Sequence, residues 1–295
     1  MAETTGISWT RSTFNPWIGC TKIGPGCDAC YAETLDKRHK WGGATHWGAG
    51  VPRFRTSAGN WKKPLKWNEQ ARIQRESGEL WAGRPGYWPV FCASLADVFD
   101  NEVPPEWLVD LFYLIRETPN LEWLLLTKRI GNVALVIKWL EQLSNVRLMI
   151  TVVNQEEADR DIPKLLALPC KNGISYEPAL GPVNFGPYLP RDKIFSMLPG
   201  FKDPMGGVQW IIIGGESAQG GHQARPFSIK WARSTIAQCK VAGVPVFMKQ
   251  MGSNAYMPRD AAGVFVPDYE YHFKDRAGAD PTEWPQDINV REFPL

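Results

Sequence analysis

The sequence predicts an α/β protein whose parallel strands form a partial (β/α)6-type barrel, and three observations support this class. From Val90 onward, short apolar runs alternate with helical patterns, the runs are mostly continuous, and the connections between them are short. Continuous apolar runs are typical of strands that are covered on both faces. Alternation with short connections favours a parallel sheet with right-handed crossovers. A doubly wound open sheet is the alternative.

Six apolar runs are predicted to be strands, and a seventh strand is expected to precede Cys20. The six runs cover residues 90–94, 123–128, 147–153, 173–178, 209–217 and 244–250. Helices are expected over 104–118, 132–143 and 228–243, because apolar residues recur there at a helical period. Gly243 is expected to end the last of these helices. Another helix, YAETLDKRH, is expected to begin directly after Cys30.

The same rhythm suggests how the chain divides. Residues 1–252 are expected to form a barrel domain with an irregular insertion, rich in Trp and Pro, over 40–89. Residues 253–295 are expected to form an irregular C-terminal wrap. The 295 residues are 44% hydrophobic and 22% charged, which argues against disorder and coiled coil. No apolar run approaches the ~20 residues that cross a bilayer, and no signal peptide is evident, so we expect a cytoplasmic chain without a membrane partner.

The charge is unevenly distributed along the chain. Residues 1–75 carry 12 Lys and Arg against 5 Asp and Glu, whereas the whole chain has a net charge of only +2. The same segment holds six of the 14 tryptophans. Cations interleaved with aromatic faces suit phosphates and stacked bases, which makes a nucleic acid or nucleotide a candidate partner. The plainer interpretation is that the rings form a core and the charges solvate a surface.

Polar residues terminate the predicted strands. Parallel α/β sheets place their ligand site at the carboxyl ends of the strands, so these residues are the site candidates. Strand ends also border solvent, and that alone would make them polar. The candidates are Ser94, Asp97, Lys128, Arg129, Asn154, Glu177, Gly214, Gly215, Glu216 and Lys249.

Three cysteines, Cys20, Cys27 and Cys30, lie in a Gly-rich loop with the spacing C-x6-C-x2-C. Thiolates bind soft metals, and three of them on a [4Fe–4S] cluster leave one iron open. A closed zinc site needs a fourth ligand, for which His39, His46 or Cys92 is available. Three unrelated free thiols are the remaining alternative. An iron–sulfur loop before a partial α/β barrel is the arrangement of radical S-adenosylmethionine enzymes.

The sequence resembles a phage-associated, three-Cys-motif family of uncharacterised radical-SAM-like proteins. The resemblance covers most of residues 7–252. It is carried by ISWTRSTFNPWIGCTKIGPGCDACYAE, ASLADVFD, LLTKR, VVNQEEADRDIP, SYEPALGPV, IIGGES, ARPF and GVPVFMKQMG. One departure is clear: the usual loop is C-x3-C-x-aromatic-C, whereas here the first gap is six residues and Ala29 precedes Cys30.

The resemblance implies that Cys20, Cys27 and Cys30 ligate a [4Fe–4S] cluster that binds S-adenosylmethionine and generates a 5′-deoxyadenosyl radical. It also implies an electron donor of the flavodoxin or ferredoxin type and a three-Cys-motif partner protein. Charge then suggests roles for the strand-end residues. Ser94, Asp97 and Glu216 would accept the cofactor ammonium, and Lys128, Arg129 and Asn154 would bind its carboxylate. Gly214 and Gly215 would allow close approach of the cofactor, and Glu177 and Lys249 are assigned to substrate binding or proton transfer.

Two other functions remain open at this point. One is a zinc-stabilised nucleic-acid-binding protein without catalysis. The other is a hydrolase or nuclease that holds Mg²⁺ with Asp97, Glu177 and Glu216, which requires the three carboxylates to share one hard cation.

Overall fold

A parallel seven-stranded sheet forms the core of the computed structural model, which describes residues 5–190, 206–257 and 271–294. Its strands are β1 (Ser12–Thr13), β6 (Pro89–Cys92), β7 (Glu122–Thr127), β8 (Val146–Thr151), β9 (Lys171–Tyr176), β10 (Ile211–Gly214) and β12 (Val246–Gln250). They follow one another in sequence order across the sheet, β1-β6-β7-β8-β9-β10-β12. A doubly wound sheet would reverse its order, so the predicted partial-barrel class is confirmed, and β1 is the seventh strand expected before Cys20.

The chain divides into two compact units. The first comprises Met1–Ile23, Tyr31–Met149 and Leu168–Lys171, and the second comprises Gly24–Cys30, Ile150–Ala167 and Asn172–Leu295. Of the three cysteines of the loop, Cys20 belongs to the first unit, and Cys27 and Cys30 belong to the second.

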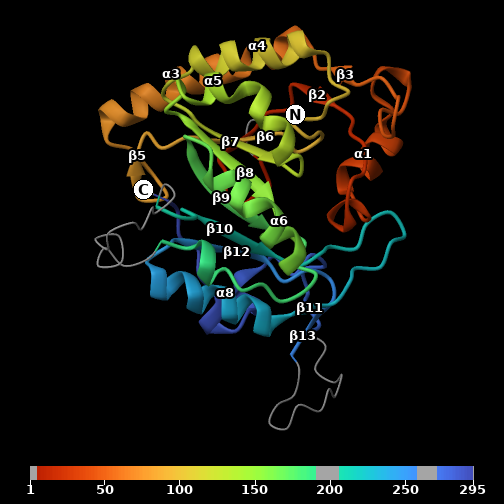
Figure 1. Cartoon of the computed structure of the whole chain (residues 1–295), viewed down its shortest axis with the longest axis vertical. Helices are drawn as coiled ribbons and strands as arrows, with labels where there is room; N and C mark the ends of the chain where they lie inside the picture. The colour runs from red at the N-terminus through yellow and green to blue at the C-terminus, as the bar shows by residue number, and fades with distance from the viewer. Residues whose placement is uncertain (1–4, 191–205, 258–270, 295) are drawn as a thin grey trace. The chain divides into compact units, whose positions relative to one another are not determined.

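Helix α4 (Pro105–Arg116) shows why the helical pattern of the first unit is readable from sequence. Its Leu111, Phe112 and Ile115 are fully buried at i, i+1 and i+4, while Glu106 and Arg116 complement the helix dipole at its two ends. Helix α1 (Tyr31–His39) begins directly after Cys30, as predicted. In Figure 1, α3, α4 and α5 lie on one side of the strands of this unit.

Two segments of the first unit differ from the prediction. The helix expected over 132–143 is a 3-10 helix (Ile130–Val136) followed by the one-turn α5 (Ile137–Leu140), because β-branched residues in that stretch lower helix propensity. Within the segment expected to be irregular, α2 (Ala58–Trp61) and α3 (Lys63–Ser77) are helical. Helix α3 buries only Pro64, Trp67 and Ala71, which explains why its apolar period is weak. Strand β3 (Phe54–Arg55) pairs antiparallel with the distant β2 (Trp17–Ile18), and β4 (Leu80–Trp81) and β5 (Arg84–Pro85) form a short hairpin.

The second unit contains α6 (Gln155–Leu166) and α8 (Ile229–Ala242). Helix α8 ends at Gly243, whose left-handed φ of 65° suits a residue without a Cβ, as predicted. The C-terminal segment is largely irregular and lines the edge of β12, where the Met248 amide donates to the Val290 carbonyl. It adds β13 (Ala255–Tyr256), paired with β11 (Phe227–Ser228). Part of the predicted wrap, 258–270, lies outside the described residues.

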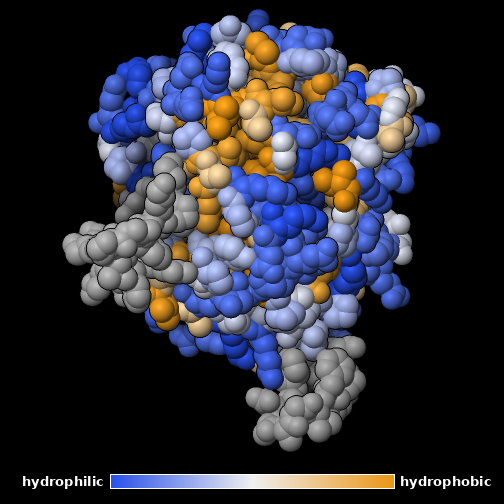
Figure 2. Space-filling model, in the orientation of Figure 1, coloured by the Kyte–Doolittle hydropathy of each residue, from blue (hydrophilic) through white to orange (hydrophobic). Residues whose placement is uncertain are grey.

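Hydrophobic side chains gather on the surface over α4 and α5 in Figure 2. Val109 and Tyr113 of α4 and Leu135 of the 3-10 helix that precedes α5 are exposed. In the described part of the chain, no helix has the length and apolar character needed to span a membrane.

Candidate functional site

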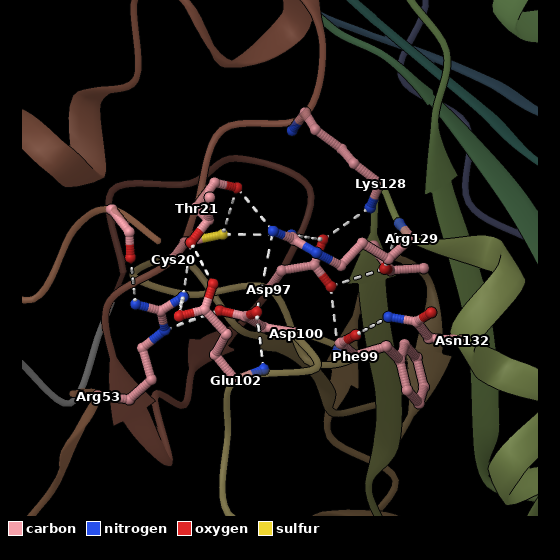
Figure 3. A network of polar contacts seen from close by, with 12 residues as sticks. Cys20, Thr21, Arg53, Asp97, Phe99, Asp100, Glu102, Lys128, Arg129 and Asn132 are labelled. Carbon is pink, nitrogen blue, oxygen red and sulfur yellow. Dashed lines mark hydrogen bonds and ion pairs between the residues drawn. The ribbon is translucent and has the colours of Figure 1, made fainter. Parts of the chain in front are cut away.

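Cys20 accepts a hydrogen bond from a buried arginine. The Arg129 Nη1 lies 3.3 Å from the Cys20 Sγ, and its Nη2 donates to the Thr21 carbonyl oxygen at 2.6 Å (Figure 3). Burial would lower the pKa of Arg129, but Asp97 and Cys20 raise it above its usual value, so the guanidinium stays charged. Burial, assisted by Asp97, raises the pKa of the Cys20 thiol to about 11. A metal ion at Cys20 would therefore replace a proton.

Asp97, placed just beyond β6, joins this arginine to the end of β7. Its carboxylate pairs with Arg129 at 3.3 Å and accepts hydrogen bonds from the Thr127 hydroxyl at 2.6 Å and the Lys128 amide at 2.9 Å. Thr127 in turn accepts from the Arg129 amide. Asp97 and Arg129, two of the candidate strand-end residues, therefore contact each other within the first unit, and the Lys128 backbone amide joins them.

A second arginine, Arg53, is buried behind Thr21. Its Nε pairs with Asp100 at 2.8 Å, its Nη2 donates to the Thr21 hydroxyl at 2.8 Å, and its Nη1 donates to the carbonyl oxygens of Gly48 and Val51. Glu102 accepts from the same Thr21 hydroxyl at 2.9 Å. Sequence reasoning missed this support, because nothing in the spacing of Arg53 links it to Cys20.

Lys128 differs from its neighbours because its side chain is half-buried and uncommitted. Within the described residues its ammonium has no hydrogen-bond or ion-pair partner, and it points away from the carboxylates of the network (Figure 3). Ser94, by contrast, accepts a hydrogen bond from the Asn15 side chain at 3.0 Å, and its carbonyl accepts from the Tyr31 hydroxyl at 2.7 Å. Lys128 is therefore the available cation of the first unit's site.

In the second unit, Cys27 and Cys30 lie on a tight turn. Cys27 ends the 3-10 helix Pro25–Cys27, and its amide donates to the Gly24 carbonyl at 2.9 Å. Both cysteines are partly accessible, as is Cys20, whereas Cys92 and Cys239 are fully buried. Three accessible thiols in one 11-residue segment are a donor set that suits a soft metal or an iron–sulfur cluster.

The thiols do not stand as a ready-made metal site. Among the residues that the structure describes, no group of three or more His, Cys, Asp or Glu is arranged to hold a metal ion. The donor chemistry of Cys20, Cys27 and Cys30 is what suits a cluster.

Glu216, just beyond β10, is held by Arg225. The Arg225 amide and Nε donate to the Glu216 Oε2 at 2.9 and 3.0 Å, and its Nη2 donates to Oε1. Burial would raise the pKa of Glu216, but the hydrogen bonds from Arg225 outweigh it and hold the pKa below its usual value. The remaining Nη1 of Arg225 pairs with Asp28 of the cysteine loop at 3.2 Å.

Glu177 and Lys249, beyond β9 and within β12, form an ion pair across the end of β10. Gly214 lies against this pair: a Cβ on it would come within 3.1 Å of the Glu177 carboxyl carbon. Gly215 is a glycine for a different reason, since a Cβ there would meet the Met251 carbonyl oxygen at 2.1 Å. Two of the candidate strand-end residues, Glu177 and Lys249, therefore contact each other in the second unit.

Asn154 caps a helix. Its Oδ1 accepts from the Glu157 amide at 2.9 Å, and the Glu157 carboxylate accepts from the Val153 amide at 3.1 Å, a reciprocal cap at the start of α6. The side chain predicted to bind a cofactor carboxylate thus has a structural partner.

The basic, Trp-rich quarter mostly follows the plainer interpretation. Trp9, Trp17 and Trp67 are buried, and several cations are paired, such as Arg55 with Asp110. Four cations are exposed and have no partner among the described side chains: Arg38, Lys40, Lys62 and Lys66.

Comparison with known proteins identifies the family of the chain but not its function. A family model described as "Protein of unknown function (DUF5131)" matches residues 4–278. No curated protein matches the sequence. A cysteine-to-serine mutant of spore photoproduct lyase is similar in structure, with a TM-score of 0.39 and 10% identity over 77% of this chain and 60% of that one. A second mutant of that lyase, with bound AdoMet and dinucleoside spore photoproduct, gives 0.40 and 11% over 71% and 56%. The chain thus spans less than two thirds of those structures.

Proposed function

We propose that this chain, which belongs to the DUF5131 family of proteins of unknown function, is an iron–sulfur protein that uses S-adenosylmethionine. The observation that carries the proposal is the set of three accessible thiols, Cys20, Cys27 and Cys30, before an α/β sheet whose strand ends carry charged residues. When bound, a [4Fe–4S] cluster would supply the electron that cleaves the cofactor's sulfonium.

The chain's own residues would bind and orient the cluster and S-adenosylmethionine. Arg129 donates to the Cys20 sulfur, which favours a sulfur that carries negative charge. Lys128 offers an uncommitted ammonium to the cofactor carboxylate, and we assign that role to it ahead of Arg129 and Asn154, whose side chains already have partners. Ser94 and Asp97 remain the proposed acceptors for the cofactor ammonium.

Glu177 and Lys249 are assigned to the substrate. The pair sits at the strand ends with each side chain about one-fifth exposed (19% and 21%), so a ligand can compete for either partner. Such a pair can hold or pass a proton at the Glu177 carboxylate. Gly214 and Gly215 would leave room beside it.

The substrate we propose is a nucleic-acid base or nucleotide. The support is the four exposed, unpaired cations Arg38, Lys40, Lys62 and Lys66, because phosphate binding depends on such charges. A flavodoxin or ferredoxin as electron donor, a three-Cys-motif partner and a reducing, cytoplasmic location accompany the proposal.

The two alternatives fit the geometry less well. For zinc, two of the three candidate fourth ligands are already committed: Cys92 is fully buried, and both ring nitrogens of His46 face carbonyl oxygens, at 2.9 Å from Pro52 and 2.7 Å from Trp41. For a Mg²⁺ hydrolase, all three carboxylates are already paired with cations, and those pairs are Asp97–Arg129, Glu177–Lys249 and Glu216–Arg225.

Anaerobic reconstitution tests the activity. Protein loaded with iron and sulfide should release 5′-deoxyadenosine and methionine from S-adenosylmethionine when dithionite is added. A protein that takes up the cluster but leaves the cofactor intact would overturn the proposed enzymatic function.

A further inference from the structure

The cysteine loop of the second unit, Gly24–Cys30, is fastened to the end of β10 by one side chain. Asp28 lies between Cys27 and Cys30, and its Oδ2 pairs with the Arg225 Nη1 at 3.2 Å. Arg225 is far away in sequence, but it is held in place by Glu216, which directly follows the glycines at the end of β10.

The geometry of Arg225 suits it for holding two groups at once. Its Nε and Nη2 form a forked contact with the two oxygens of Glu216, and its backbone amide adds a third hydrogen bond. A bidentate arginine–carboxylate contact fixes the plane of the guanidinium. Nη1 is thereby aimed at the loop, and the Glu216 carboxylate that fixes it is only 6% exposed.

The start of the same loop lies close to helix α6. A Cβ built on Gly24 would stand 3.2 Å from the Glu157 Oε1, so this position has little room for a side chain. Glu157 belongs to the cap that begins α6. The loop is therefore tied to its surroundings by the Asp28–Arg225 ion pair, and at Gly24 it passes close to α6.

We propose that Arg225 is a positioning residue that latches the cysteine loop, holding Cys27 and Cys30 in place before a metal arrives. The inference rests on the proposed function for its purpose, since a prearranged pair of thiols reduces the ordering that cluster binding requires. It also gives Glu216 a role other than cofactor binding: it anchors the latch.

Thiol labelling of the metal-free protein tests the latch without any cluster. We would measure the alkylation rate of each cysteine with N-ethylmaleimide by peptide mass spectrometry, in the wild type, R225Q, R225K and R233Q. Arg233 forms a comparable forked pair with Asp287 in the same unit and serves as the matched control. Cys20, in the first unit, is the internal control.

The latch and simple electrostatics predict opposite signs. An effect of charge alone would slow labelling on loss of the arginine, because cations favour the thiolate form that reacts. Loss of a partly exposed ion pair would instead open the loop and speed labelling of Cys27 and Cys30 by about two- to five-fold, the equivalent of a typical exposed pair. R225K, which keeps the charge but lacks the fork, should also speed it, whereas R233Q and Cys20 should not change.

Reconstitution separates the latch from the proposed function. Faster labelling of R225Q together with lower iron retention after gel filtration would support both the latch and the iron–sulfur proposal. Faster labelling in a chain whose wild type binds no cluster would leave the latch standing and overturn the iron–sulfur proposal. Labelling of Cys27 and Cys30 at or below the wild-type rate in both R225Q and R225K would overturn the latch.

Discussion

The Arg129 guanidinium donates a hydrogen bond to the Cys20 sulfur at 3.3 Å and forms an ion pair with Asp97 at the same distance. One charged group therefore contacts both a proposed cluster ligand and a proposed cofactor ligand, and both contacts lie within the first unit. A guanidinium beside a thiolate stabilises its negative charge, whereas Asp97 opposes it. Burial raises the pKa of Cys20 most, Asp97 adds to that rise, and Arg129 opposes both.

Replacing Arg129 should lower both the free energy of unfolding and the reactivity of the Cys20 thiol. R129Q leaves the Asp97 carboxylate buried without its cation, and breaking a buried pair costs about 3–5 kcal/mol of unfolding free energy. It should also slow alkylation of Cys20. Urea unfolding and thiol labelling of the metal-free protein measure the two effects.

R147Q is the matched control, because Arg147 forms a buried pair with Glu122 at 2.9 Å in the same unit. It should destabilise the protein by a similar amount while leaving Cys20 alkylation unchanged. Equal Cys20 reactivity in R129Q and R147Q would argue against the role of Arg129 at the sulfur.

Lys128 is expected to matter for the cofactor and not for the fold. K128Q should leave urea unfolding unchanged, because the ammonium has no partner among the described residues. A charged hydrogen bond is worth about 1.5–3 kcal/mol, so the Kd for S-adenosylmethionine should rise at least ten-fold. Calorimetric titration of the reconstituted protein measures this, with K138Q as the exposed-lysine control. Unchanged affinity in K128Q would mean that a residue other than Lys128 binds the carboxylate of S-adenosylmethionine.

Glu216 should make the fold sensitive to acid. Its folded-state pKa is held below the usual value by Arg225, so its contribution to stability is complete above the unfolded pKa of about 4.3 and is lost as the pH falls through the lower folded value. E216Q should remove that part of the pH dependence. The test is urea unfolding at several pH values from 6 down to about 3, with E141Q, a change at another exposed carboxylate, as control. Parallel acid curves for the wild type and E216Q would contradict this linkage.

The nucleic-acid proposal has a test in salt. Binding of a fluorescent single-stranded oligonucleotide should weaken linearly in log Kd against log salt. Each lost phosphate contact should reduce the slope by about 0.7, so K62E/K66E should flatten it. The control K138E/K240E changes the net charge equally, at lysines outside the basic quarter. Identical slopes in the two double variants would show that the oligonucleotide does not bind at Lys62 and Lys66.

Sequence patterns predict the sheet well because its strands are buried on both faces, as in β8, where all six residues are buried. A short apolar run between turn signals fits such a strand better than a helix, which needs about ten or more residues. Helix α3 is not predicted by its apolar period because it buries only three residues. Helix α5 is shorter than its apolar spacing predicts because β-branched residues lower helix propensity in that stretch.

For the site, sequence identifies the strand-end charges but not their partners. Arg129 follows the β7 apolar run directly, whereas Arg225 and Arg53 lie in loops whose position depends on tertiary contacts. Asp28 pairs with a residue almost 200 positions away, and the local pattern of apolar and polar residues cannot predict such a contact.

The iron–sulfur proposal is decided by the iron and sulfide content of cysteine variants after anaerobic reconstitution, followed by their visible and electron paramagnetic resonance spectra. We expect C20S, C27S and C30S each to lose the [4Fe–4S] signal, while C170S, a change at another partly accessible cysteine, retains it. A colourless wild type that holds a single zinc, or full iron content in any of the three loop variants, would contradict it.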